Sequence, residues 1–245
     1  MPNKRLRMFA GPNGSGKTTV FNEIKIEYDL DLGIYLNADE IEKKLKKKNS
    51  ISISDFNLSA EVGSKFNDFI SSHTLFRKAE NDGYKIDLTF EDGLILNHNS
   101  RTHSYEASIL TDFLRQELIK SGQKLSFETV MSHPSKIETL KFSKQKNYKN
   151  YLYFISTESV EINKSRVIER VLNGGHPVPP IKIEERYYRS LEMLQDAIKS
   201  TYRTFIFDNS ESKSRLILDI HKAKTVTYQS DRIPNWVDKY CLGIK

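Results

Sequence analysis

Short apolar runs alternate with amphipathic stretches along most of this chain. Runs that fit buried strands occur at residues 6–9, 33–39, 124–130, 151–155 and 204–207. Between them, apolar residues recur every three or four positions, as in helices, most clearly over 20–28, 104–121 and 183–194. The alternation predicts an α/β fold: a parallel sheet with right-handed crossovers and helices on both faces. The tail, with an apolar run at 216–218, is expected to finish the edge of the sheet.

Two stretches interrupt the alternation. Residues 49–103 contain helical patterns around 56–70 and a hairpin pattern, with strands at 84–90 and 94–96 on either side of 91–93. We interpret this stretch as an insertion over the ligand-binding edge of the sheet. Residues 158–195 contain a helix, a glycine–proline break and a second helix, which makes this stretch a candidate lid. A chain of 245 residues can form one large domain. We therefore expect a single domain over 1–245, with an insertion at about 49–103 and a lid at about 158–195.

A glycine-rich motif follows the first apolar run. It matches G-x-x-x-x-G-K-[ST] and consists of Gly11, Pro12, Asn13, Gly14, Ser15, Gly16, Lys17 and Thr18. Glycines in this arrangement let backbone N–H groups face one concavity, and the following helix adds its positive dipole end. Lys17 would reach the terminal phosphates and the Thr18 hydroxyl would bind Mg²⁺. The other interpretation is a glycine turn between a strand and a helix.

Two acidic residues stand where ligands are bound in α/β sheets. Asp39 follows the second apolar run, so it is either a site residue at the tip of that strand or a cap of the next helix. Glu128 lies within the third run, where an apolar residue is expected. Because an unpaired buried carboxylate costs several kcal/mol, Glu128 either faces a polar site or is paired.

Arginines gather in the candidate lid. Arg166 and Arg170 are four positions apart on one helix, and Arg186 and Arg189 are three apart on the next. Like charges this close repel one another unless an anion lies between them. The side chains therefore either bind phosphate or are solvated separately on the surface.

Charge and composition narrow the class of protein. The net charge is +6 and the pI about 9.1, so nucleic acid is a possible partner, although the lysine run at 43–48 fits a solvated helix face as well. Cys241 is the single cysteine, and the histidines lack metal-site spacing. No apolar stretch approaches the ~20 residues of a membrane helix, so we expect a soluble, cytoplasmic protein. The Leu-Ser-Gly-Gly-Gln motif of transporter ATPases is absent.

The ordered motifs resemble those of the zeta-toxin family of P-loop kinases. The resemblance covers most of the chain and is strongest at five places: the glycine motif with Thr19, Asn37-Ala38-Asp39-Glu40-Ile41, Phe127-Glu128-Thr129, Arg170 with Gly174-Gly175-His176-Pro177-Val178-Pro179, and Phe207-Asp208-Asn209-Ser210. It implies a P-loop NTPase fold that is nucleoside-kinase-like, with a parallel sheet of five to six strands. The stretch 49–103 departs from the smaller family pattern.

The resemblance also implies an activity and its residues. ATP, bound with Mg²⁺ by Gly11 to Thr19, would phosphorylate a hydroxyl of a small molecule, a UDP-N-acetyl sugar in the characterised toxins. Asp39 would be the base, Lys17 and Thr18 the phosphate and Mg²⁺ contacts, and Glu128 and Thr129 the substrate contacts. Arg170 matches the first phosphate-bracing arginine, and Arg186 is the nearest candidate for the second. A separate antitoxin protein is a possible partner.

Two other functions compete with this interpretation. The pI and the lysine run leave open a polynucleotide kinase or a nucleic-acid-associated NTPase, whereas the acceptor of the small-molecule kinase would be a UDP-sugar or nucleotide-like. A non-catalytic nucleotide-binding module is the third hypothesis. The motifs favour the small-molecule kinase, because phosphoryl transfer mainly requires charge neutralisation and alignment of an attacking hydroxyl.

Overall fold

The computed structural model describes residues 4–175 and 177–243, and the chain divides into two compact units. One unit comprises Met1–Leu32 and Ser126–Lys245, and the other comprises Gly33–Leu125. His176, in the glycine–proline break, lies outside the described residues. Organisation as one kinase domain with an insertion and a lid stays a prediction.

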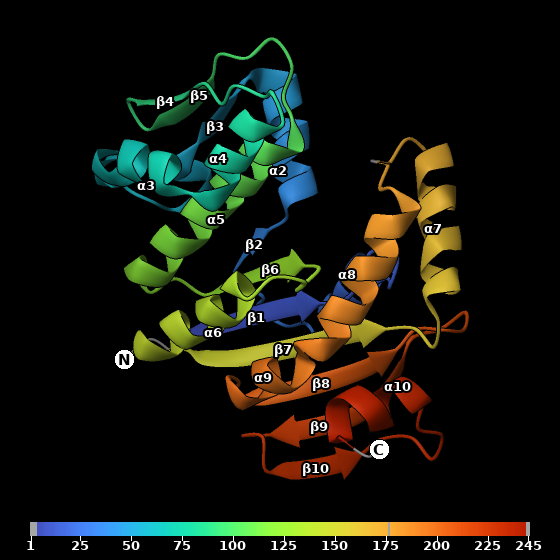
Figure 1. Ribbon diagram of the computed structural model, residues 1–245. Helices are drawn as coiled ribbons and strands as arrows, with labels where there is room; N and C mark the ends of the chain where they lie inside the picture. The colour runs from blue at the N-terminus through green and yellow to red at the C-terminus, as the bar shows by residue number, and fades with distance from the viewer. Residues whose placement is uncertain (1–3, 176, 244–245) are drawn as a thin grey trace. The chain divides into compact units, whose positions relative to one another are not determined.

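The first unit is built on a β-sheet (Figure 1). Six of the seven strands of this sheet belong to the unit, in the order β10-β9-β8-β7-β1-β6, and the seventh, β2, belongs to the second unit. The strands of the first unit are β1 (Arg5–Ala10), β6 (Leu125–Thr129), β7 (Lys149–Ser156), β8 (Arg203–Asp208), β9 (Arg215–His221) and β10 (Thr225–Tyr228). Its helices are α1 (Lys17–Glu27), α6 (Ser135–Gln145), α7 (Val160–Leu172), α8 (Pro180–Glu192), α9 (Leu194–Lys199) and α10 (Asn235–Val237), followed by a π-helical turn over Asp238–Leu242.

The expected α/β fold is confirmed, but the sheet is larger and less uniform than predicted. β1, β7 and β8 run parallel, whereas β9 and β10 are antiparallel to their neighbours. The predicted sheet was parallel with five to six strands, and the observed one has seven. Residues 209–214 join β8 to β9, and a connection this short cannot make the crossover that a parallel pair needs.

Aromatic rings tie the central strands together on one face. Phe9, Tyr153 and Phe205 lie opposite one another in register on β1, β7 and β8. The Phe9 and Tyr153 rings stack at 4.5 Å, and the Tyr153 and Phe205 rings at 5.0 Å. Phe21 of α1 meets Phe9 edge-on at 5.0 Å. This packing fixes α1 against the strand that precedes it.

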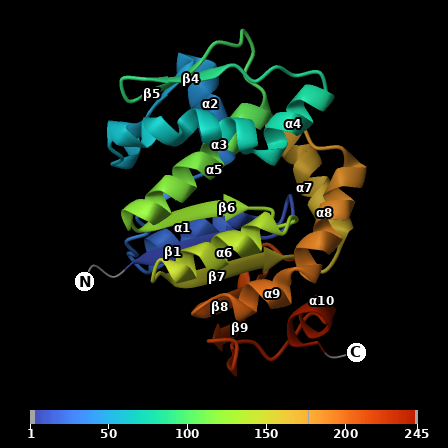
Figure 2. The same ribbon diagram turned by 60° about the vertical axis from the view of Figure 1, so that its left-hand side comes forward.

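Helices of the first unit pack on the sheet and on one another. α6 and α9 cover part of one sheet face (Figure 2). α7 and α8 lie side by side in both views as a helical hairpin, joined by residues 173–179 (Figures 1 and 2). α7 begins at the Ser159 cap, whose hydroxyl accepts from the Ile162 N–H at 3.5 Å, and α8 has proline in its first turn. The helix–break–helix pattern thus forms a hairpin.

The second unit is organised around the long helix α5. A capping box of His103 and Glu106 begins this helix, and Gly122, at φ 79°, ends it. The Phe113 ring packs against Phe66 and Phe69 at 5.1 and 5.3 Å. The elements of the unit are β2 (Ile34–Leu36), α2 (Ala38–Lys48), β3 (Ser50–Ser52), two 3₁₀ turns (Ile53–Phe56 and Ala60–Lys65), α3 (Phe66–Ser72), α4 (Thr74–Asn81), β4 (Leu88–Glu91), β5 (Leu94–Asn97) and α5 (Ser104–Ser121). β3, β5 and β4 form a three-stranded antiparallel sheet.

Candidate active site

The glycine motif forms the turn from β1 into α1. Gly11 and Gly16 have φ values of 148° and 87°, which L side chains rarely adopt. A side chain would not fit at either position: a Cβ would lie 1.9 Å from the Ile155 carbonyl oxygen at Gly11 and 2.1 Å from Asn209 Nδ2 at Gly16. The loop therefore requires glycine both for its backbone conformation and for its close contacts.

The groups of the loop fit a chain of phosphates. Lys17 Nζ curls over the loop and donates to the carbonyl oxygens of Gly11 and Pro12 at 3.0 and 2.9 Å. The buried side-chain oxygens of Asn13 and Ser15 have no hydrogen-bond partner among the described residues. Phosphate oxygens beside a helix N-terminus are natural partners for a lysine and a hydroxyl placed in this way. These residues can hold the triphosphate of a nucleotide.

A hydroxyl and a carboxylate meet beside the loop. Thr18 Oγ1 donates to Glu128 Oε2 at 2.9 Å, and Thr18 is exposed while Glu128 is half-buried on β6. A threonine hydroxyl next to a carboxylate offers oxygen atoms to Mg²⁺, so the pair fits this metal. Among the described residues no group of three or more His, Cys, Asp or Glu could hold a metal. Any Mg²⁺ here would therefore need further oxygen ligands, such as phosphate and water.

Two asparagines support the loop from behind. Asn209, directly after β8, donates from Nδ2 to the Ser15 carbonyl oxygen at 2.8 Å. Asn163 of α7 donates to the Asn13 carbonyl oxygen at 2.5 Å. The sequence interpretation missed Asn163, although its position between Val160 and Val167 gave a signal, because that helical face is otherwise apolar.

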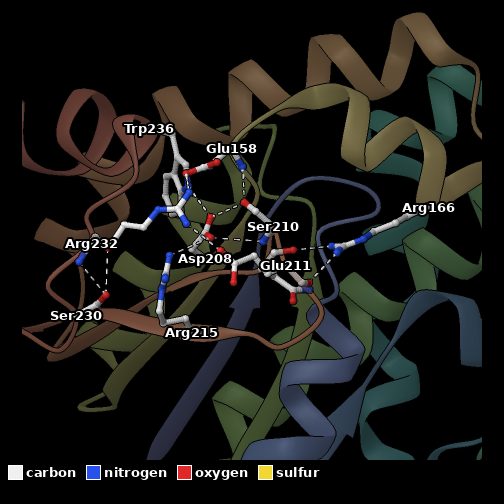
Figure 3. A network of polar contacts seen from close by, with 10 residues as sticks. Glu158, Arg166, Asp208, Ser210, Glu211, Arg215, Ser230, Arg232 and Trp236 are labelled. Atoms are coloured by element: carbon white, nitrogen blue, oxygen red, sulfur yellow. Dashed lines mark hydrogen bonds and ion pairs between the residues drawn. The ribbon is translucent and has the colours of Figure 1, made fainter.

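A network of polar contacts builds the segment that carries Asn209 (Figure 3). The buried Asp208 carboxylate accepts from Trp236 Nε1 at 3.1 Å and from the Ser210 hydroxyl at 2.8 Å, and lies 3.7 Å from Arg215. Arg232 forms ion pairs with Glu158 at 3.4 Å and Glu211 at 2.9 Å (Figure 3). The Phe207–Ser210 motif thus acts as a brace whose Asn209 amide reaches the glycine loop.

The arginines of α7 and α8 have different surroundings. Arg166 donates to the carbonyl oxygens of Asn209 and Glu211 at 2.7 and 3.2 Å, so it is tied to the brace (Figure 3). Arg170 is exposed in the last turn of α7, and the backbone of Gly175 folds over it. Arg189 pairs with Glu185 at 3.4 Å.

Arg186 stands apart from the other arginines of this hairpin. It is half-buried and makes no hydrogen bond or ion pair with any residue that the structure describes. Burial lowers the pKa of its guanidinium, and the nearby charge of Arg189 lowers it further. A partly desolvated cation without a counter-ion is suited to an anionic ligand.

The remaining predicted residues are placed as follows. Asp39 lies in the first turn of α2, where the helix is capped by Asn37: the Asn37 side chain accepts from the Asp39 N–H at 2.9 Å. The exposed Asp39 carboxylate has no hydrogen bond or ion pair within the described residues, so capping does not occupy it. Thr129 ends β6, where its carbonyl oxygen accepts from the Gly11 N–H at 3.2 Å and its hydroxyl from the Met131 N–H at 3.1 Å.

Fold and site together define a P-loop protein of the kinase-like α/β class. The family model described as zeta toxin matches residues 95–222, slightly more than half of the chain. The chain belongs to the zeta toxin family. Comparison with curated protein sequences finds no match.

Two solved structures share the fold. The structure titled AvrRxo1-ORF1:-ORF2 with ATP has a TM-score of 0.55 and 14% identity, over 93% of this chain and 61% of that one. A structure from the PezAT chromosomal toxin–antitoxin system of Streptococcus pneumoniae has a TM-score of 0.52 and 13% identity, over 99% of this chain and 80% of that one. The chain spans about three fifths of the length of the chain that it matches in the first of these structures. No helix within the described residues is long and apolar enough to cross a membrane.

Proposed function

We propose that this protein is an ATP-dependent kinase of the zeta-toxin type, which transfers the γ-phosphate of ATP to a hydroxyl of a small molecule. The observation that carries the proposal is the glycine loop of the first unit, where Lys17, Thr18 and Glu128 surround a site for a triphosphate. Family membership supports a phosphotransferase, and the family resemblance suggests a UDP-N-acetyl sugar as the acceptor.

The residues of the chain have distinct tasks in this reaction. Lys17 would leave the carbonyl oxygens of Gly11 and Pro12 to contact the phosphates of ATP. Arg170 and Arg186 would stabilise the charge on the transferred phosphoryl group, a role worth ~10³-fold or more in comparable enzymes. Mg²⁺, held by Thr18 and near Glu128, would supply charge neutralisation at the phosphate oxygens. Glu128 would hold the Thr18 hydroxyl in place, and Glu128 and Thr129 would contact the acceptor.

Asp39 is the proposed general base. Its carboxylate is exposed and free of hydrogen bonds within the described residues, so it can accept the proton of an acceptor hydroxyl. Asn37 caps the helix and thereby leaves Asp39 available. Because Asn37 is the N-cap residue of α2, the interpretation of Asp39 as the helix cap is not supported.

The decisive experiment compares two neutralising variants on one helix. Asp39→Asn should lower ATP-dependent phosphorylation of UDP-N-acetylglucosamine by about 10²-fold or more, with ATP affinity unchanged, because it removes only the base. Glu40→Gln, next to it and also exposed, removes the same charge and should retain activity. Product formation is followed with labelled ATP and mass spectrometry. Equal activity of the two variants on every UDP-sugar and nucleotide tested would sink the proposal.

The nucleic-acid-associated alternative has lost the support of the lysine run. Lys44 pairs with Asp55 at 3.4 Å and Lys46 with Glu42 at 2.5 Å, and the run lies on the exposed face of α2. Part of its charge is thus already neutralised by side chains of the same unit. The solvated helix face is the better interpretation of this run.

We also propose a protein antitoxin as a partner. The two structural neighbours come from a toxin–antitoxin system and from a two-protein complex, as their titles state. Expression of this chain should then arrest growth, a Lys17→Ala variant should not, and the antitoxin should restore growth while abolishing ATP binding. Growth arrest by Lys17→Ala as strong as by the natural chain would contradict the assignment of toxicity to the kinase site.

A further inference from the structure

A cavity lies at the opposite end of the parallel strands from the glycine loop. Its volume is about 310 Å³, and it is lined by residues at the ends of α6 and α9, at the starts of β7 and β8 and in the turn after β9. β7 begins at this cavity with Lys149, and its last residue, Ser156, accepts from the Asn209 N–H behind the glycine loop. Eight residues of strand span roughly 25 Å, so the cavity is separate from the candidate active site. In Figure 1 the arrowheads of β1, β7 and β8 point the same way, as expected for parallel strands.

The lining of this cavity is basic. It contains four lysines and two tyrosines and no carboxylate: Lys144, Lys149, Lys199, Lys222, Tyr148 and Tyr202, with Asn150, Ser200 and Thr201. A further lysine, Lys4, adjoins it, because its Nζ lies 5.8 Å from the Tyr148 ring centre and donates to the Lys146 carbonyl oxygen at 3.4 Å. We call Lys4 and the four lysines of the lining the basic edge.

The charge of the basic edge is not balanced by the protein. Of its lysines only Lys199 forms an ion pair within the described residues, a 3.5 Å contact with Asp196 in which both side chains are exposed. Lys149 and Lys222 instead lie over the same aromatic ring, that of Tyr202, at 4.9 and 5.8 Å. A ring quadrupole attracts each ammonium but leaves its net charge in place. Several positive charges therefore converge from segments far apart in sequence.

We propose that the basic edge binds the phosphodiester backbone of single-stranded nucleic acid. The cavity lining offers no arginine fork that would fix one phosphate in one orientation. Lysines on flexible stems act as point charges, which suits a ligand with many phosphates in a row. Tyr148 is buried, but Tyr202 is half-buried and lies beside Lys149 and Lys222, and an accessible ring beside lysines is typical of surfaces that bind single strands. This binding goes beyond the proposed kinase reaction and does not require it.

The test measures the affinity of a labelled twelve-nucleotide single-stranded RNA by fluorescence anisotropy at several salt concentrations. The triple variant Lys144→Gln/Lys149→Gln/Lys222→Gln should weaken binding at least tenfold and reduce the slope of log K against log salt by about 2, since each phosphate contact contributes about 0.7. The matched control, Lys43→Gln/Lys47→Gln/Lys48→Gln on α2, removes the same charge from exposed positions and should change the affinity less than twofold.

Three outcomes would overturn the proposal: no binding by the natural chain, equal losses in the two triple variants, or inorganic tripolyphosphate binding as tightly as the RNA, which would mark a site for small anions. If the triple variant does not fold, the single variant Lys222→Gln, in an exposed turn, should still reduce the slope by about 0.7. Binding of an ATP analogue should be unchanged in all these variants, so failure of this proposal is distinguishable from failure of the kinase proposal.

Discussion

At the scale of single residues, the contact between Gly16 and Asn209 explains why the glycine loop tolerates no side chain. Gly16→Ala should weaken ATP binding strongly, because the new Cβ would collide with the Asn209 amide at 2.1 Å and the positive φ adds about 1 kcal/mol of strain. Asn209→Ala should weaken binding by about tenfold through loss of the hydrogen bond to the Ser15 carbonyl oxygen.

The double variant separates two effects of Gly16→Ala: the steric clash with Asn209 and the backbone strain at residue 16. Gly16→Ala/Asn209→Ala should bind ATP better than Gly16→Ala alone, because removal of the amide makes room for the new Cβ. Isothermal titration calorimetry with a non-hydrolysable analogue measures the four affinities of the cycle. If the losses of binding free energy in the two single variants simply add in the double variant, residues 16 and 209 do not interact.

Cys241 gives a second prediction at this scale. Burial raises the pKa of its thiol to about 12, so the native protein should react very slowly with Ellman's reagent at pH 8 and rapidly once unfolded. Because an unfolded thiol ionises near pH 8.5, the contribution of this group to stability should be present below that pH and be lost as the pH rises towards 12. Denaturant titrations at pH 7, 9 and 10 follow this loss, and Cys241→Ser should remove it.

At the scale of elements, the connection between α7 and α8 contains a matched pair of glycines. A Cβ at Gly175 would lie 2.6 Å from Arg170 Cγ, whereas a Cβ at Gly174 would meet nothing within 4 Å. Gly175→Ala should therefore displace Arg170 and lower kcat by about 10- to 100-fold. Gly174→Ala should cost about 1 kcal/mol of stability through its positive φ and keep its activity. Equal kcat values for the Gly174→Ala and Gly175→Ala variants would show that the position of Arg170 does not affect catalysis.

The sequence predicted long elements well and short ones poorly. α5 was expected over 104–121 and has those bounds, because five turns of periodicity and a terminal glycine specify it. In the stretch 49–103, the three-residue β3 and two 3₁₀ turns are too short to show a period. The hairpin strand expected from Tyr84 begins at Leu88 instead, since Tyr84 packs its ring on His103 at 4.0 Å.

The candidate site residues within a sequence motif could be predicted, whereas contacts between residues far apart in sequence could not. Lys17 and Thr18 were expected at the phosphates and Mg²⁺, and Glu128 at the acceptor. The Thr18–Glu128 hydrogen bond brings two of these residues together. The supporting roles of Asn163 and Arg166 depend on which backbone carbonyl each meets, and spacing along the chain does not specify that.

At the scale of the whole molecule, nucleotide binding should stabilise the fold. A non-hydrolysable ATP analogue at 100 times its Kd should add ~2.7 kcal/mol and raise the Tm by roughly 5 to 10 °C for a chain of this size. Lys17→Ala should remove most of the shift, and turnover should disappear with it. A shift that persists in Lys17→Ala would place the nucleotide elsewhere than the glycine loop. Turnover lost together with binding would exclude a non-catalytic module.

Net charge is also a property of the whole molecule, but it does not indicate which surface of the protein carries the excess positive charge. The lysine run at 43–48 is conspicuous in the sequence, yet two of its members are paired with carboxylates. The basic edge is assembled from Lys4, Lys149, Lys222 and their neighbours, which only the folded sheet brings together. The number of charges follows from the composition, but the fold determines which of them lie close together.

The hydrogen bond between Asn209 and Ser15 joins positions 194 residues apart, which has a consequence for synthesis. A ribosome makes the glycine loop early and its brace late, so a nascent chain carries the phosphate-binding residues long before the asparagine that holds them. A chain stalled before residue 208 lacks Asn209 and also Asp208 with its partners Trp236 and Arg215, so it lacks the whole brace. We expect such a chain to bind no ATP analogue, and analogue binding by it would refute this. If the expectation holds, the chain gains its ability to bind ATP only after translation has passed Asn209.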